Sequence, residues 1–228
     1  MGGFQNYLDQ SISLEGRLTG VFDEEHISQE QRIKLLAFLL PLKIKHPLTY
    51  DHSIRVGLLV FWIAKCLHLD AKALLYAGLI HDVGKDKMDL SLLTKTEGWT
   101  RADAEQMKQH VIEGHSMTFD EFGFSSDSTV RHHRHQFDGY PESLPPLRHP
   151  YCVVTQALIE ANGRIVALAD CFDSLHRGND RFSGQVPLTG EQIKIKMLDL
   201  NPDRRVLVRH LYQMGVFTTK IFPSSVSE

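Results

Sequence analysis

Residues 79–85 read Leu-Ile-His-Asp-Val-Gly-Lys, an apolar run that ends in an adjacent histidine and aspartate. At the end of a hydrophobic helix, neighbouring side chains can turn towards one point, so His81 and Asp82 can bind one metal ion and Asp82 can bridge two. Gly84 fits a helix C-terminus that needs a left-handed residue, and Lys85 places a cation beside any anion that the metals hold. Taken alone, the pair fits a buried structural role better than a metal site, so the rest of the chain decides its interpretation.

The composition is that of an ordinary globular chain with room for one sizeable core: 228 residues, 42% hydrophobic and 23% charged. The net charge of -3 does not provide the positive surface that binds a nucleic-acid polymer. We therefore expect that any anionic ligand is small and is bound by a few nearby cationic groups. No apolar run is long enough to span a bilayer, and the N-terminus lacks a signal pattern, so we expect a cytoplasmic protein without membrane contact. The three cysteines show no CxxC spacing and therefore predict neither a disulfide framework nor a zinc knuckle.

The apolar periodicity predicts an all-α protein, since almost no segment alternates with the period of a strand. A capping box at Ser28 and Gln31 starts a helix that we expect to end near Pro41. The periodic apolar residues of this helix are Ile33, Leu36, Ala37 and Leu40. Further helices are expected over residues 50–68, 71–81, 101–114, 116–128, 151–161 and 163–172, with a loop over 86–98 and two more helices within 190–217. We expect one helical-bundle domain over residues 46–228, with residues 1–45 as a helical arm packed on it.

The 13 histidines are the unusual feature of the composition, and they cluster between the first motif and residue 135. Histidine is the commonest metal ligand in proteins, so this clustering indicates a metal site. The candidate ligands on separate predicted helices are His52, His81, Asp82, His110, His133 and Asp170. Side chains that converge from several helices are how helical bundles build metal sites. Several imidazoles with two carboxylates suit iron, manganese, nickel or zinc, and they exclude a calcium site made only of oxygen ligands.

Five motifs in order resemble one known family. They are His52-Ser53 with Arg55-Val56, the HDVGK motif at 81–85, His110 with Gly114, an HxH pattern before Phe137-Asp138-Gly139-Tyr140-Pro141, and RIVALADCFDSL from Arg164. This set is similar to the HD superfamily of metal-dependent phosphohydrolases, and its flanking residues look like the HD-GYP branch, whose known members hydrolyse cyclic di-GMP. The resemblance covers residues 49–181. It implies an all-helical fold with a single HD domain around two or three metal ions, usually iron or manganese.

Carried over to this chain, the resemblance assigns the ligands of two ions. His52, His81, Asp82 and Asp170 would bind the first ion, and Asp82, His110 and His133 would bind the second. Lys85 would hold the phosphate or protonate the leaving oxygen, so Asp82 and Lys85 are the candidate catalytic residues. Arg55 and Lys95 become candidate phosphate contacts beside Lys85. Asp138 fits a structural cap of the GYP loop, and Asp173 fits a residue that orients an imidazole.

Three departures from the family pattern affect the metal assignment. Counting back from Asp138, Arg134 replaces the second of two adjacent histidines and His135 follows it, unless a slip of one residue makes His132 and His133 the pair. The loop is shortened to DGYP, without the two residues that usually separate the glycine from the tyrosine. Leu48 occupies the position where some members place a glutamate for a third metal. We therefore expect two divalent ions, most often iron or manganese in this family, with nickel or zinc as alternatives.

The leading hypothesis is a metal-dependent phosphodiesterase or phosphohydrolase that uses a metal-activated water, with cyclic di-GMP or a related cyclic dinucleotide as its substrate. Other HD-type possibilities stay open at this point. They are a nucleotide phosphohydrolase with another substrate, a di-iron oxygenase and a non-catalytic signalling module. The sequence does not determine the oligomeric state.

Overall fold

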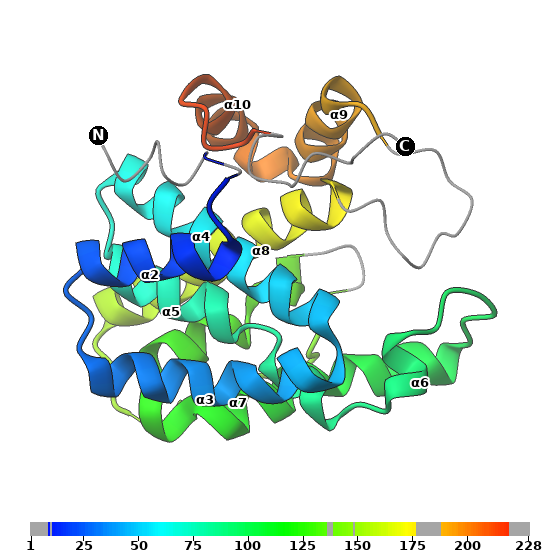
Figure 1. The fold of residues 1–228 in the computed structure, drawn as a ribbon. Coiled ribbons are helices and arrows are strands. Elements are labelled where there is room, and N and C mark those ends of the chain that lie inside the picture. The colour runs from blue at the N-terminus through cyan, green and yellow to red at the C-terminus, as the bar shows by residue number, and fades with distance from the viewer. Residues whose placement is uncertain (1–8, 10, 136–138, 148, 177–187, 219–228) are drawn as a thin grey trace.

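The computed structural model describes residues 9, 11–135, 139–147, 149–176 and 188–218. This part of the chain contains helices and connecting segments but no strand, which confirms the all-α prediction (Figure 1). The elements are α2 (Leu14–Glu24), α3 (Gln29–Lys45), α4 (Pro47–Leu67), α5 (Ala71–Ile80), η1 (Val83–Lys87), α6 (Leu90–Leu93), α7 (Arg101–Thr129), η2 (His132–His135), α8 (Val153–His176), α9 (Gly190–Leu200), η3 (Pro202–Arg204) and α10 (Arg205–Gln213). None of the described helices combines the length and apolarity that crossing a bilayer requires.

The hydrophobic core surrounds α4 and α5, and residues from α2 to α10 contribute to one apolar cluster. Phe61 on α4 and Leu75 on α5 are fully buried within it. The predicted arm takes part in the same core, because Leu18 on α2 and Leu39 on α3 belong to the cluster. The segment around α6 lies at the edge of the bundle, away from α9 and α10 (Figure 1). There Met88, Leu92 and Met107 form a separate small cluster, which we call the satellite core.

Two helices of the core approach each other through glycines. A Cβ atom at Gly78 on α5 would lie only 2.8 Å from the Cα of Gly57 on α4, which no real packing tolerates. Because neither residue carries a side chain, the two helix backbones can come close together. This contact holds His52, in the first half of α4, near His81, which follows α5 directly.

Gly84 does not have the left-handed conformation that the sequence predicted, because Gly98 and Gly215 are the described glycines with positive φ. The physical reason for a glycine is close approach. A Cβ atom at Gly84 would overlap the carbonyl oxygen of His110 and lie 2.5 Å from the amide nitrogen of Gly114. The η1 turn therefore packs directly against the backbone of α7. This packing brings Asp82 next to His110.

The prediction for α3 was wrong in its end, and the residues that the helix buries are not the periodic apolar residues that indicated it. The helix continues through Pro41 to Lys45, because Leu42 beyond the proline is fully buried and its packing outweighs the lost backbone hydrogen bond. Of the four periodic apolar residues, Ile33 is 58% exposed and Leu40 is 53% exposed. The buried residues are Leu35, Leu39 and Leu42. The helix carries two apolar faces, and periodicity alone cannot choose between them.

Several helix boundaries also differ from the expectation. The helices predicted over 101–114 and 116–128 form the single α7, in which Phe122 has non-helical dihedral angles and marks a kink. The helices predicted over 151–161 and 163–172 likewise form the single α8. The expected loop over 86–98 contains part of η1 and all of α6.

The close approach at Gly84 predicts a large effect of a single methyl group. We expect Gly84→Ala to lower the free energy of unfolding by about 3 kcal/mol, because the backbones of η1 and α7 must separate. Gly20→Ala on α2 is the matched control, since nothing lies within 4 Å of its added Cβ and alanine is the better helix former by about 1 kcal/mol. Urea denaturation measures both variants. Equal stability of the two variants would contradict this explanation of Gly84.

Candidate metal centre

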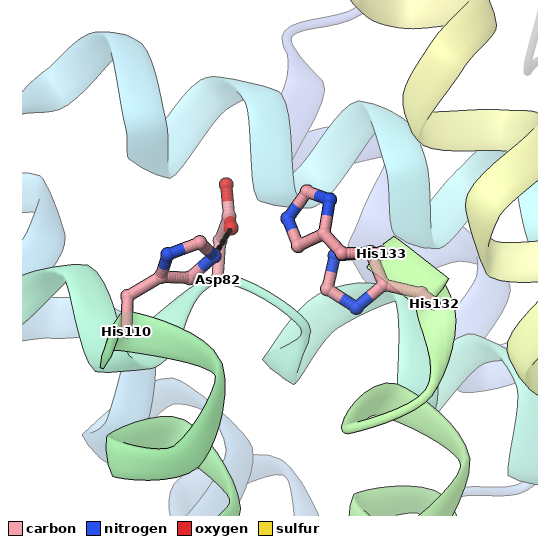
Figure 2. A group of neighbouring side chains, drawn as sticks. All are labelled: Asp82, His110, His132 and His133. Atoms are coloured by element: carbon pink, nitrogen blue, oxygen red, sulfur yellow. Dashed lines mark ion pairs between the residues drawn. The ribbon is translucent and has the colours of Figure 1, made fainter. Parts of the chain in front are cut away.

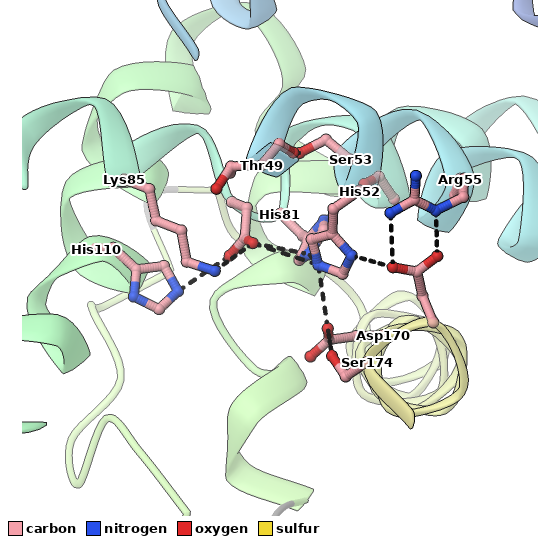
Figure 3. Close-up of polar contacts among 12 residues, drawn as sticks. Thr49, His52, Ser53, Arg55, His81, Lys85, His110, Asp170 and Ser174 are labelled. Carbon is pink, nitrogen blue, oxygen red and sulfur yellow. Dashed lines mark hydrogen bonds and ion pairs between the residues drawn. The ribbon is translucent and has the colours of Figure 1, made fainter. Parts of the chain in front are cut away.

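Side chains from α4, the end of α5, α7, η2 and α8 meet inside the bundle, and each of them is at most 8% exposed. They form two groups, and within each group the possible ligand atoms all lie within 4.8 Å of one another. The first group is His52, His81 and Asp170, and the second group is Asp82, His110, His132 and His133. Figure 2 shows the second group, and Figure 3 shows the polar contacts around the first. The structure therefore brings together all seven residues that the sequence selected as metal ligands.

Asp82 lies between the two groups and directs one carboxylate oxygen towards each. Its Oδ2 atom is 3.4 Å from Nε2 of His52 and 3.4 Å from Nε2 of His81. Its Oδ1 atom is 3.2 Å from Nε2 of His110 (Figure 2). Nε2 of His52 is in turn 3.2 Å from Oδ1 of Asp170. This is the position that a carboxylate bridging two ions would need.

Four imidazoles are oriented by a hydrogen bond at Nδ1. His81 donates to the carbonyl oxygen of Gly78 at 2.7 Å, and His52 donates to Oδ2 of Asp173 at 2.6 Å, the contact that the sequence suggested for this aspartate. The other two pairs are His110 with the carbonyl oxygen of Met107 and His132 with the carbonyl oxygen of Thr129, both at 2.5 Å. Carbonyl and carboxylate oxygens only accept, so the proton of each ring is on Nδ1. The Nε2 lone pairs therefore face the centre.

Acceptor atoms consequently face other acceptor atoms in the centre. Nε2 of His52 and Nε2 of His81 are 3.1 Å apart, and in its neutral form each ring already carries its proton on Nδ1. Oδ1 of Asp82 and Nε2 of His110 and of His132 are buried without a hydrogen-bond partner among the described residues. Burying polar atoms without partners is unfavourable. Divalent cations would satisfy these atoms, and a set of imidazole nitrogens and carboxylate oxygens fits transition metals such as iron, manganese, nickel and zinc.

The electrostatics give these groups the protonation states that metal ligands need. Burial raises the pKa of Asp82, but the Lys85 ammonium and His81 outweigh it and hold that pKa well below its usual value. Burial lowers the pKa of His132 to about 3, and burial followed by the neighbouring imidazoles lowers the pKa of His133 well below its usual value. At neutral pH the carboxylate of Asp82 is therefore charged, and the imidazoles of His132 and His133 are neutral. Both forms bind metal without first losing a proton.

The three cations expected at the phosphate are each paired with a carboxylate. Nζ of Lys85 lies 2.5 Å from Oδ2 of Asp82, inside the centre (Figure 3). Arg55 donates from Nε to Oδ1 of Asp173 at 2.6 Å, so it supports the carboxylate that orients His52. Nζ of Lys95 lies 2.7 Å from Oδ2 of Asp103, at the start of α7.

Lys95 is thus hydrogen-bonded at a helix N-terminus, and none of its ion pairs in the described part of the chain involves a residue of the metal centre. The role of phosphate contact stays a prediction for Lys85 and Arg55, and the position of Lys95 does not support it there.

The structure also decides which histidines of the run 132–135 face the centre. His132 and His133 are buried in the second group, whereas Arg134 and His135 are exposed. The pair reached by a slip of one residue is therefore the one that the fold brings into the second group, and its role as metal ligands stays a prediction. Asp138, the expected cap of the GYP loop, lies outside the described residues.

Tyr140 is a neighbour of the centre that sequence reasoning did not identify. Its ring stacks on His133, with centroids 4.4 Å apart and an angle of 22° between the planes, and it meets His110 edge to face at 6.2 Å. The available signal was its place in the GYP segment. The three carbonyl oxygens that fix imidazoles carry no signal in the sequence, because any residue type supplies a carbonyl.

A family model for the HD domain matches residues 49–175, which is more than half of the chain, so the chain belongs to the HD-domain family. A solved structure of the HD domain of the L. monocytogenes phosphodiesterase PgpH is similar, with a TM-score of 0.54, 14% identity, and coverage of 81% of this chain and 94% of that chain. The same domain in complex with cyclic-di-AMP matches with a TM-score of 0.50, 15% identity, and coverage of 81% and 90%. At this identity the likeness establishes the fold. No curated protein sequence matches the chain.

The hydrogen bond from His52 to Asp173 predicts the effect of weakening it. We expect Asp173→Asn to lower metal affinity by about 10- to 100-fold, because the imidazole loses the charged acceptor that fixes its orientation. Competition against a chromophoric chelator measures this affinity, and circular dichroism checks the fold. Asp199→Asn is the control, since that carboxylate is exposed and pairs only with Arg205 at 3.5 Å in the described structure. Unchanged affinity in Asp173→Asn would show that His52 does not depend on this partner.

The lowered pKa values of His81, His132 and His133 predict how the metal-free protein responds to acid. Unfolded histidines bind protons below about pH 6.5, whereas these folded ones stay neutral, so the unfolded state binds more protons. The free energy of unfolding of the metal-free protein therefore does not change with pH through these histidines above about pH 6.5. It declines as the pH falls towards 3, by up to about 1.4 kcal/mol per pH unit for each histidine. Urea denaturation of chelator-treated protein between pH 7.5 and 5 measures this slope. A flat profile would contradict the neutral, buried state of these rings.

Proposed function

We propose that this chain is a metal-dependent phosphohydrolase that hydrolyses a phosphodiester, with a cyclic dinucleotide as its substrate. The observation that carries the proposal is the buried cluster of inward-facing imidazole and carboxylate atoms with the Lys85 ammonium beside it. Membership of the HD-domain family supports it. The similar solved domains also support it, since they come from a phosphodiesterase and one of them holds cyclic-di-AMP.

The two groups divide the ligands of two ions between them. His52, His81 and Asp170 would hold one ion together with Oδ2 of Asp82, and His110, His132 and His133 would hold the other together with Oδ1. When bound, two such cations polarise a phosphoryl oxygen and lower the pKa of a water molecule. We infer iron or manganese as the ions, in line with the family resemblance and the ligand types.

The residues of the chain supply position and charge. Lys85 is 15% exposed at its side chain, so its ammonium can reach both Asp82 and a phosphate that enters the centre. There it would bind a phosphoryl oxygen and balance the negative charge that develops on the leaving oxygen. Asp173 and Arg55 keep His52 in place from outside the cluster. Burial of the whole set excludes bulk water and strengthens these electrostatic interactions.

Two cyclic dinucleotides are the candidate substrates. The sequence segments 137–141 and 164–175 favour the HD-GYP branch and cyclic di-GMP, whereas the solved neighbour favours cyclic-di-AMP. Both molecules present the same chemistry to the centre, namely a phosphodiester between two ribose units. The bases differ, and no described contact distinguishes them.

The test is an analysis of reaction products. Protein purified without oxygen and loaded with Mn²⁺ or Fe²⁺ is incubated with cyclic di-GMP and with cyclic-di-AMP, and the products are separated by chromatography. We expect a linear dinucleotide or mononucleotide, and a rate at least about 10²- to 10³-fold lower for Asp82→Ala, which removes the carboxylate shared by both groups. Asp199→Ala is the control and should keep full activity, because it removes an exposed carboxylate that lies far in the sequence from the candidate ligands. No product from either substrate with metal confirmed as bound would overturn the proposed substrate class.

A further inference from the structure

A cyclic dinucleotide carries two phosphodiesters, and only one of them can lie over the metal ligands at a time. The other phosphate lies on the far side of the nucleotide ring and must be accommodated at the rim of the centre. Two of the candidate phosphate contacts are paired with carboxylates: Arg55 with Asp173, and Lys95 with Asp103. Binding of the second phosphate at the edge of the buried cluster therefore requires another cationic side chain, one whose present ion pair a phosphate can replace.

Lys108 lies close enough to the second group of candidate ligands for this role, and its side chain is partly exposed. It lies on α7, two residues before His110, and its Nζ atom is 5.9 Å from the ring centroid of Tyr140. The same tyrosine ring stacks on His133 and meets His110, so the ammonium lies one aromatic ring away from the second group of metal ligands. Tyr140 is partly exposed, which places this contact at the edge of the buried cluster.

The ion pair of Lys108 is one that a phosphate can replace. Its Nζ lies 2.9 Å from Oε1 of Glu105, and the two side chains are 31% and 57% exposed. Exposed pairs of this kind contribute little to stability, because solvent screens them and holding two long side chains costs entropy. The pair of Lys85 differs, since Asp82 is 1% exposed and is shared by both groups of ligands.

We propose that Lys108 binds the second, unreacting phosphate of the dinucleotide, and that the ring of Tyr140 forms the adjacent wall against which the nucleotide packs. This inference rests on the proposed function and extends it to substrate selection. A substrate with two phosphates gains a charge-assisted contact at the rim, whereas a diester with one phosphate reaches only the metal ligands and Lys85. Lys108 would therefore favour dinucleotides over simple phosphodiesters.

The experiment compares two substrates in matched lysine variants. For Lys108→Gln we expect the KM for the cyclic dinucleotide to rise about tenfold, with kcat within about twofold, because a contact to a distant phosphate serves binding. Hydrolysis of bis(p-nitrophenyl) phosphate, which has one phosphate, should be unchanged. Lys108→Arg should restore most of the affinity. Lys65→Gln is the control and should leave both substrates unaffected, because Lys65 is an exposed residue of α4 that pairs with Glu25 at 3.1 Å, thirteen residues beyond His52.

Calorimetric titration with the same dinucleotide gives a second readout that does not require turnover. We expect binding to Lys108→Gln to be about tenfold weaker than to the wild type. An equal loss with both substrates would overturn the inference, since it would mean that Lys108 acts on the metal ligands through His110. Unchanged KM and unchanged binding would overturn it as well. If the wild type neither binds nor hydrolyses a cyclic dinucleotide, the proposed substrate class fails and this inference fails with it. If the wild type hydrolyses the dinucleotide and Lys108→Gln does so equally well, only the role of Lys108 is contradicted.

Discussion

The repulsion among buried acceptor atoms is the constraint that the surrounding structure has to overcome. Nε2 of His52 and of His81 lie 3.1 Å apart, and Oδ2 of Asp82 lies 3.4 Å from each. When both rings are neutral, each carries its proton on Nδ1 and none lies between them. Such an arrangement is unfavourable by itself and persists only where the packing around it is rigid. The core supplies this rigidity, because α4 and α5 are buried along most of their lengths and approach each other at Gly57 and Gly78. The fold thus keeps in place a set of ligands whose mutual repulsion a cation would relieve.

The imidazoles are fixed in two physically different ways. His81, His110 and His132 each donate from Nδ1 to a backbone carbonyl three residues earlier, so each ring is oriented by its own helix or turn. His52 instead depends on Asp173, which lies 121 positions away in the sequence and also accepts from Arg55. A local partner is present as soon as the helix forms, whereas the distant one requires that α4 and α8 are already packed together. The orientation of His52 is therefore the feature of the centre that reports most directly on the tertiary fold.

The residue types in the sequence predicted well which side chains the fold brings together, and their arrangement less well. Imidazole and carboxylate side chains in a recurring order selected these residues as candidate ligands, because few other residues bind such metals. The choice between His133 with His135 and His132 with His133 depended on which side chains the η2 turn buries, and no local pattern contains that information. The same limit explains α3, whose two apolar faces have the same period, and Gly84, whose glycine is required by a backbone 26 positions away in sequence at His110. Tertiary packing decided each of these cases.

The two groups of ligands also differ in how firmly they are supported. The first group lies on α4, directly after α5 and on α8, and all three helices contribute to the main core. In the second group, His110 is oriented by the carbonyl oxygen of Met107, whose side chain belongs to the satellite core with Met88 and Leu92. The ion pair of Lys95 with Asp103 joins the segment that follows α6 to the first turn of α7. Because a small cluster is easier to disturb than the main core, we expect the position of His110 to depend more on the packing of the segment around α6 than the positions of His52 and His81 do.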